Sequence, residues 1–169
     1  MRDTTTEVNF VPGAETAREF RDALGRFGTG ITVVTCATPT GPLGITANSF
    51  ASVSLDPPLV LWSPAKSSSR YPFYVAAQHF AIHVMGQDQH ETCRGFARDG
   101  TAFDGVCWSE GAHRVPLLEG CLARFECTKV AEHDGGDHTI IVARVTRAAS
   151  QDGAPLLFFG GHYGGFAGA

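Results

Sequence analysis

Small polar side chains gather in one stretch of this chain, residues 44–54. Thr46, Asn48 and Ser49 offer hydrogen-bond donors and acceptors with little bulk. A flat, polar ligand would find few steric obstacles to the backbone there. The alternation of β-branched and small residues favours a strand, so the stretch predicts a strand whose end binds such a ligand.

A hydroxyl-rich segment with two cations, residues 63–70, follows shortly afterwards. Lys66 supplies a point charge for a dianion, and Ser67 to Ser69 supply hydroxyls at a predicted helix start. Backbone N–H groups and the helix dipole favour anions at such a position. A serine-rich surface loop is the alternative. With the preceding strand, the segment suggests a site for a mononucleotide-type cofactor.

Two further groups of residues could contact a ligand. The run Gly136-Asp137-His138-Thr139 places a histidine beside an aspartate after a glycine turn, and imidazole titrates near neutral pH. A partly exposed strand histidine is the alternative. Phe96 and the glycine-rich aromatic tail, residues 157–166, could stack on a planar cofactor or simply pack in the core.

Composition argues against several classes of protein. The formal charge of −4 disfavours nonspecific nucleic-acid binding, and no apolar run is long enough to cross a membrane. The N-terminus has no signal-peptide pattern. The five cysteines form no CxxC pair, which favours a reduced, cytoplasmic protein. Metal binding is not predicted, since the cysteines and histidines of residues 121–138 have no compact zinc spacing. The chain also lacks the nucleophile elbow of hydrolases and the Rossmann glycine fingerprint.

The rest of the sequence predicts the elements that position these residues. Residues 1–13 are expected to be mobile, and residues 14–169 are expected to form one domain. An amphipathic helix is predicted over residues 14–27, ended by Gly28-Thr29-Gly30. Short helices are predicted over residues 67–77 and 88–97. Strands are predicted over residues 31–36, 59–62, 80–85, 122–130, 139–148 and 156–159, with hairpin-type turns at Asp134-Gly135-Gly136 and Asp152-Gly153. Many short strands indicate a mainly β protein, an antiparallel barrel with helical additions.

An ordered set of motifs along residues 17–163 resembles the flavin reductase-like family, the reductase components of two-component flavin monooxygenases. The set includes Phe20-Arg21-Asp22-Ala23-Leu24-Gly25-Arg26-Phe27, Thr29-Gly30-Ile31-Thr32-Val33-Val34-Thr35, Gly44-Ile45-Thr46-Ala47-Asn48-Ser49-Phe50, Ser54-Leu55-Asp56-Pro57-Pro58-Leu59-Val60, Lys66-Ser67-Ser68, Phe96-Ala97, Phe103-Asp104-Gly105-Val106, Pro116-Leu117-Leu118, Gly136-Asp137-His138 and Pro155-Leu156-Leu157. The resemblance implies an FMN-binding split barrel, an antiparallel Greek-key barrel with peripheral helices, normally as a homodimer.

The resemblance also implies roles for individual residues. It implies that Thr46, Ala47, Asn48 and Ser49 line the isoalloxazine and ribityl chain of the flavin. Further contacts are implied for the flavin phosphate (Ser63, Lys66, Ser67, Ser68), for the flavin (Phe96, Ala97), for the nicotinamide (His138) and for the dinucleotide (Gly161, His162, Tyr163). Relatives often carry an arginine or a second aromatic residue in the tail, where this chain reads Gly160-Gly161-His162-Tyr163. The tail therefore does not decide the pose of the nicotinamide or the preference between NADH and NADPH.

The function predicted from these features is an NAD(P)H:flavin oxidoreductase. It would reduce FMN or FAD by hydride transfer and supply the reduced flavin to a separate oxygenase. Asn48, Ser49 and nearby N–H groups would stabilise negative charge on the reduced flavin ring. The alternatives are a flavoprotein oxidase that acts directly on a small substrate, and a non-catalytic flavin- or haem-binding barrel.

Overall fold

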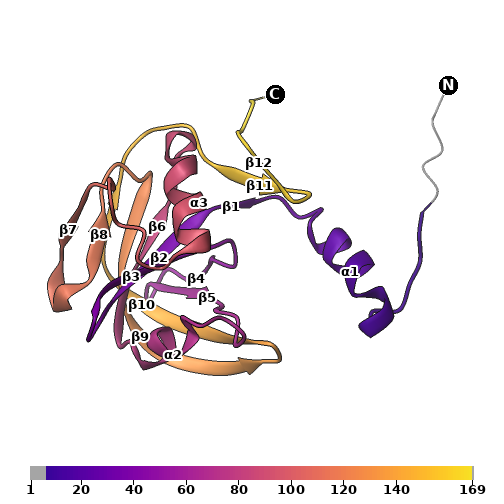
Figure 1. Cartoon of the computed structure of the whole chain (residues 1–169), viewed down its shortest axis with the longest axis horizontal. Coiled ribbons are helices and arrows are strands. Elements are labelled where there is room, and N and C mark those ends of the chain that lie inside the picture. Colours follow the sequence, from indigo (N-terminus) through magenta and orange to yellow (C-terminus); the bar gives the residue numbers. More distant parts are fainter. Residues whose placement is uncertain (1–6, 169) are drawn as a thin grey trace.

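A seven-stranded antiparallel sheet forms the body of the protein in the computed structural model, which describes residues 7–168 (Figure 1). Its strand order is β3-β2-β6-β9-β10-β5-β4. The strands are β2 (Thr32–Thr38), β3 (Gly41–Ala47), β4 (Ala51–Ser54), β5 (Leu59–Trp62), β6 (His79–Val84), β9 (Ala123–Gly135) and β10 (His138–Ser150). The prediction of a mainly β, antiparallel fold is confirmed.

Smaller elements surround this sheet. A three-stranded sheet joins β1 (Thr29–Gly30), β11 (Leu157–Phe159) and β12 (His162–Gly164), and β7 (Trp108–Glu110) pairs with β8 (Pro116–Leu118). The helices are α1 (Ala17–Leu24), α2 (Tyr71–Ala76) and α3 (His90–Arg98), with short 3-10 helices at Ala14–Thr16, Gln87–Gln89 and Ala112–Arg114. In Figure 1, α3 lies across the sheet next to β11 and β12.

Two apolar clusters hold these layers together. One lies within the curved sheet around Trp62 and Phe80, and the other lies beneath α3 around Phe96 and Leu118. Gly44 on β3 is required for the second, because a Cβ atom at this position would lie 2.5 Å from the Phe96 ring. The absence of a side chain at Gly44 therefore lets α3 approach the end of β3.

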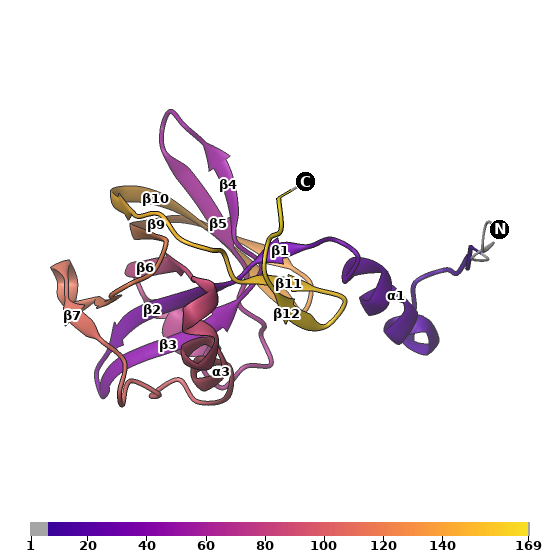
Figure 2. The same ribbon diagram turned by 90° about the horizontal axis from the view of Figure 1, so that it is seen from above.

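The N-terminal helix differs from its prediction. The α-helix covers only Ala17–Leu24, and no residue of it is buried. It ends at Gly25, which has a right-handed φ of −63°, so the predicted left-handed glycine cap at residues 28–30 is wrong. Figure 2 shows α1 extending away from the sheet. Of the segment predicted to be mobile, residues 1–6 lie outside the described residues, and residues 7–13 contain no helix or strand.

One of the two predicted hairpin turns is wrong. The turn at residues 134–136 joins β9 to β10 as expected, with Gly136 at φ 78°. After Asp152-Gly153, however, the chain leaves the large sheet, and β11 pairs with β1 and β12. The cause is that β10 already pairs with β9 on one side and β5 on the other, so the strand that follows β10 cannot pair with it. None of the helices within residues 7–168 is long and apolar enough to cross a membrane.

Candidate functional site

A cleft of about 370 Å³ lies where β3 ends, beside α3 and the β11–β12 hairpin. We call it the β3 cleft. Its lining comprises Ile31, Ile45, Thr46, Ala47, Asn48, Ser68, Arg70, Ala97, Phe158 and Tyr163. Six residues predicted for the site from the sequence are among them: Thr46, Ala47, Asn48, Ser68, Ala97 and Tyr163. Segments far apart in the sequence thus form one cavity.

Hydrogen bonds fix the β3 wall of this cleft. The Thr46 hydroxyl donates to the Cys93 carbonyl of α3 at 2.6 Å, and the Thr32 hydroxyl donates to the Ala47 carbonyl at 2.8 Å. These bonds hold β3 against α3 and β2. The Asn48 side chain, just beyond the strand, is exposed and offers both a donor and an acceptor.

Arg70 is the charged residue of the cleft lining, and no individual site role was predicted for it from the sequence. Its guanidinium donates to the Gly44 carbonyl at 3.1 Å, to the Phe96 carbonyl at 2.5 Å and to the Ala97 carbonyl at 3.1 Å. It therefore joins the end of α3 to β3 and places positive charge at the cleft wall. The only signal in the sequence was the second cation of residues 63–70.

Two aromatic rings from β11 and β12 also line the cleft. Tyr163 of β12 packs edge-on against Phe158 of β11, with ring centroids 5.3 Å apart, and against His90 at 4.7 Å. Burial raises the pKa of Tyr163, so its phenol stays protonated at neutral pH and can donate a hydrogen bond. This part of the lining is therefore aromatic, and the Tyr163 hydroxyl gives it a polar group.

Several other predicted residues do not line the β3 cleft. The Ser49 hydroxyl accepts the Ser63 N–H at 2.9 Å and donates to the Ser63 carbonyl, so the two serines tie the turn after β3 to the following segment. Phe96 is fully buried and belongs to the core beneath Gly44. Ser67 and His162 are exposed.

Lys66 and His138 meet at the tip of the β9–β10 hairpin. The Lys66 N–H donates to the Asp137 carbonyl at 2.9 Å, and an isolated bridge pairs Ala65 with His138. The His138 Nδ1 lies 2.7 Å from an Asp137 carboxylate oxygen. His138 is therefore outside the cleft lining but next to the segment that contributes Ser68 and Arg70 to it.

A second cavity, of about 480 Å³, lies between α1 and the β11–β12 turn. We call it the α1 cavity. It shares Asn48 and Phe158 with the β3 cleft, and its wall carries Arg21, Arg26 and Gly161. The Gly160 N–H donates to the Gly25 carbonyl at 2.9 Å, which holds the turn against α1. Its charged lining is two arginines and one aspartate, Asp22, so it favours an anion.

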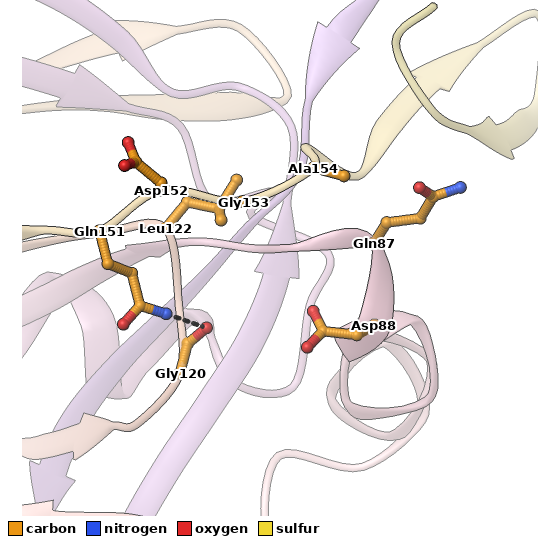
Figure 3. A pocket seen from close by; sticks show the side chains of 8 residues that line it. All are labelled: Gln87, Asp88, Gly120, Leu122, Gln151, Asp152, Gly153 and Ala154. Carbon is orange, nitrogen blue, oxygen red and sulfur yellow. Dashed lines mark hydrogen bonds between the residues drawn. The ribbon is translucent and has the colours of Figure 1, made fainter.

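A third cavity, of about 380 Å³, lies beside the connection from β10 to β11 (Figure 3). Figure 3 shows its polar lining, in which the Gln151 amide donates to the Gly120 carbonyl at 3.0 Å. It shares no lining residue with the β3 cleft or the α1 cavity. Asp88 and Asp152 are its charged residues, and no cation lines it, so it does not suit the phosphate-bearing ligand suggested by the sequence.

Comparison with known proteins gives consistent matches. Residues 24–167 match the family model described as a flavin reductase like domain. The FMN reductase (NADH) SmoA of Agrobacterium fabrum is 61% identical over 93% of this chain and 90% of its own length. The reductase component of a flavin-dependent trigonelline monooxygenase from Acinetobacter baylyi is 45% identical over 86% of this chain, which spans only 48% of that relative. The solved NADH:FAD oxidoreductase SgcE6 of Streptomyces globisporus, in complex with NAD and FAD fragments, aligns with a TM-score of 0.86 at 36% identity, covering 94% of this chain and 98% of that one.

Proposed function

Because the chain belongs to the flavin reductase-like family, we propose that it transfers hydride from NAD(P)H to a flavin in the β3 cleft. The protein is an NAD(P)H:flavin oxidoreductase, and the reduced flavin goes to a separate oxygenase component. The observation that carries the location is the end of β3: small residues, Thr46 to Asn48, line a cleft together with Ala97 and two aromatic rings.

The residues of the cleft fit a flavin. The flavin ring is flat and polar along one edge, and the cleft lining combines small side chains with the rings of Phe158 and Tyr163. The exposed Asn48 amide can bond to the polar edge of the ring. The Arg70 guanidinium adds positive charge to the wall, which favours an anionic reduced flavin.

The protein's part in the reaction is positioning and electrostatics. When bound, the flavin supplies the atom that accepts hydride from the nicotinamide. The β3 wall, fixed by Thr46 and Thr32, holds one side of the site rigid. Asn48 and Arg70 stabilise the negative charge that develops on the reduced ring. The hydroxyl of Ser49 is bonded to Ser63, so we assign Ser49 to holding the loop rather than to the flavin.

The test of this function is a turnover assay with purified protein, NADH and a molar excess of FMN or FAD. The expected result is oxidation of many equivalents of NADH per protein under anaerobic conditions, with bleaching of the added flavin. A protein that holds yellow flavin but oxidises no NADH would contradict the proposal and favour a flavin-binding barrel. Bleaching of only its own bound flavin would favour an oxidase.

We assign the dinucleotide to the α1 cavity and to His138. The α1 cavity shares Asn48 and Phe158 with the β3 cleft, and its two arginines suit the pyrophosphate of NAD(P)H. Gly161 lines this cavity, which supports the dinucleotide contact predicted for the tail. His138, held by Asp137, is proposed to orient the nicotinamide end from the side of residues 63–70.

Replacing His138 with alanine is expected to raise the KM for NADH by about tenfold, because an orienting hydrogen bond contributes about 1–2 kcal/mol. The KM for flavin should change much less. Steady-state kinetics with each substrate varied in turn measures both constants. His133→Ala is the matched control, since His133 is exposed on the same hairpin. Equal effects of the two replacements on the KM for NADH would contradict this role.

We propose that the protein is a homodimer in which the second copy covers α1. Phe20, Leu24 and Phe27 of this region are 43%, 59% and 78% exposed, so its own chain leaves much of this apolar surface uncovered. Light scattering is expected to give twice the chain mass of 18.0 kDa. The double replacement Leu24→Asp and Phe27→Asp should shift the protein toward the monomer, and a monomeric unmodified protein would contradict the proposal.

We also propose that the protein works in the reducing cytoplasm. All five cysteines are free, and four of them are buried. Burial raises the pKa of Cys36, Cys93 and Cys127 to about 12, so these thiols are protonated and poor nucleophiles. Such cysteines serve packing and need no oxidising compartment.

A further inference from the structure

The β9–β10 hairpin turn, residues 134–138, lies directly on the segment predicted to hold the flavin phosphate. The Lys66 N–H donates to the Asp137 carbonyl at 2.9 Å, and the Thr139 N–H donates to the Pro64 carbonyl at 3.1 Å. The turn therefore fixes the backbone on both sides of Ala65. The turn therefore also determines the backbone position from which the Lys66 side chain extends.

The same turn also engages the Lys66 side chain. The Lys66 ammonium lies 2.5 Å from a carboxylate oxygen of Asp134, and that oxygen also accepts the Gly136 N–H at 3.1 Å. The hydrogen bond between the two side chains raises the pKa of Lys66 and lowers the pKa of Asp134. Both groups are therefore charged at neutral pH, and the carboxylate is held in place by its own turn.

The charges around Lys66 do not favour a phosphate dianion. Asp134 contacts the ammonium, and the Asp137 carboxylate also acts on it. The Asp137 carboxylate is itself bonded to His138. The nearby Arg70 guanidinium is occupied by three backbone carbonyls. A phosphate that approaches Lys66 must share the ammonium with Asp134 and meets a second carboxylate.

We propose that Asp134 sets the affinity of this protein for the flavin phosphate by competing with it for Lys66. The proposal rests on the proposed function and names a residue that favours release of the flavin. A reductase that supplies reduced flavin to a separate oxygenase must release it in each turnover. Both partners are partly or largely exposed, with side chains 38% and 80% accessible, so the competition weakens phosphate binding without abolishing it.

The test compares FMN with riboflavin, which has the same ring but no phosphate. Flavin fluorescence titrations give the dissociation constants for the unmodified protein and for Asp134→Asn. The expected result is FMN binding about two- to fivefold tighter in Asp134→Asn, since an exposed ion pair has a modest free energy. Riboflavin binding should not change. Added salt should narrow the difference between the two proteins, because it screens exposed charges.

Two further variants make the result specific. Lys66→Met should weaken FMN and leave riboflavin unchanged, and adding Asp134→Asn to it should give no further gain. Asp152→Asn removes the same charge from an exposed residue outside the β3 cleft and should change neither flavin. Weaker FMN binding in Asp134→Asn would overturn the inference, since Asp134 would then position Lys66 for the phosphate. Equal changes for FMN and riboflavin would also overturn it.

Competition by Asp134 and flavin reduction by NADH are tested separately. If the turnover assay with NADH and FMN succeeds and Lys66→Met leaves FMN affinity unchanged, the phosphate binds elsewhere and only the inference is wrong. If no NADH is oxidised in the presence of flavin, the proposed function itself is wrong.

Discussion

Replacing His83 with leucine is expected to lower the free energy of unfolding at pH 7 by about 3 kcal/mol. The His83 ring is fully buried on β6. Its Nδ1 lies 3.0 Å from the Val33 carbonyl, and its Nε2 accepts the Leu118 N–H at 3.0 Å. Nε2 accepts and Nδ1 donates, so the ring is neutral and joins β2 to β8. Leucine would leave the buried Leu118 N–H without a partner and would remove the side-chain donor from the Val33 carbonyl. Urea denaturation followed by circular dichroism measures the loss.

His83 should also make stability depend on pH. Burial lowers the pKa of His83 from 6.5 to about 4, with a smaller contribution from Arg124, although the bond to Val33 opposes the shift. Between these two pKa values the unfolded chain binds a proton that the folded chain does not. The stabilisation is therefore complete above pH 6.5 and is lost as the pH falls toward 4, by about 3 kcal/mol in total.

The control separates this titration from the others in the protein. His83→Gln cannot titrate and retains a side chain that can hydrogen-bond, so it serves if His83→Leu fails to fold. The difference in unfolding free energy between the unmodified protein and His83→Gln should shrink as the pH falls from 6.5 to 4. A difference that stays constant over this range would contradict a neutral, buried His83.

Local patterns predicted much of the site. The end of β3, the helix over Phe96 and the hairpin turn at residues 134–136 depend on residues that are close in sequence, and each lies near its predicted place. Most strands of the seven-stranded sheet follow from apolar runs and turn signals, but residues 44–54, predicted as one strand, belong to two strands, β3 and β4, separated at residues 48–50. The order of the strands does not follow from such signals, because it is decided by which edges remain free after each pairing. The wrong hairpin at Asp152-Gly153 is a consequence of that.

The roles of individual polar residues were less predictable. Ser49 was expected at the ligand, yet it bonds Ser63, and Lys66 was expected to be available for a phosphate, yet it pairs with Asp134. These partners are 14 and 68 residues away in sequence, so no local pattern reports them. The α1 helix was predicted from its apolar face, but sequence periodicity does not say whether its own chain or another covers that face.

Arg70 illustrates the same limit most clearly. Arg70 belongs to the doubly basic, serine-rich segment of residues 63–70 that was expected to hold a phosphate. In the fold its guanidinium instead satisfies carbonyls at the end of α3 and on β3. The last carbonyls of a helix have no partners within the helix, so a planar group with several donors suits this place. Its contact with the cleft is then a consequence of that packing.

Replacing Arg70 with methionine is therefore expected to affect flavin binding and stability together. The carbonyls of Gly44 and Phe96 are in buried residues and would lose a charged donor, which should lower the free energy of unfolding by about 2 kcal/mol. The gap between α3 and β3 would no longer be fixed, so the dissociation constant of flavin should rise by at least about tenfold. Denaturation and flavin fluorescence titration measure the two effects.

The control and the conservative variant decide what Arg70 contributes. Arg98→Met removes the same charge from an exposed residue at the end of α3 and should leave both quantities nearly unchanged. Arg70→Lys keeps the charge but lacks the planar fork that reaches three carbonyls, so it should restore flavin affinity only in part. If Arg70→Lys restored flavin affinity fully, the positive charge alone would account for the effect of Arg70 on flavin binding. A single ammonium cannot reproduce the hydrogen bonds of the guanidinium to three carbonyls. Lower stability with unchanged flavin affinity would instead confine Arg70 to the packing of α3, and the β3 cleft would then owe its shape to Gly44 and Thr46.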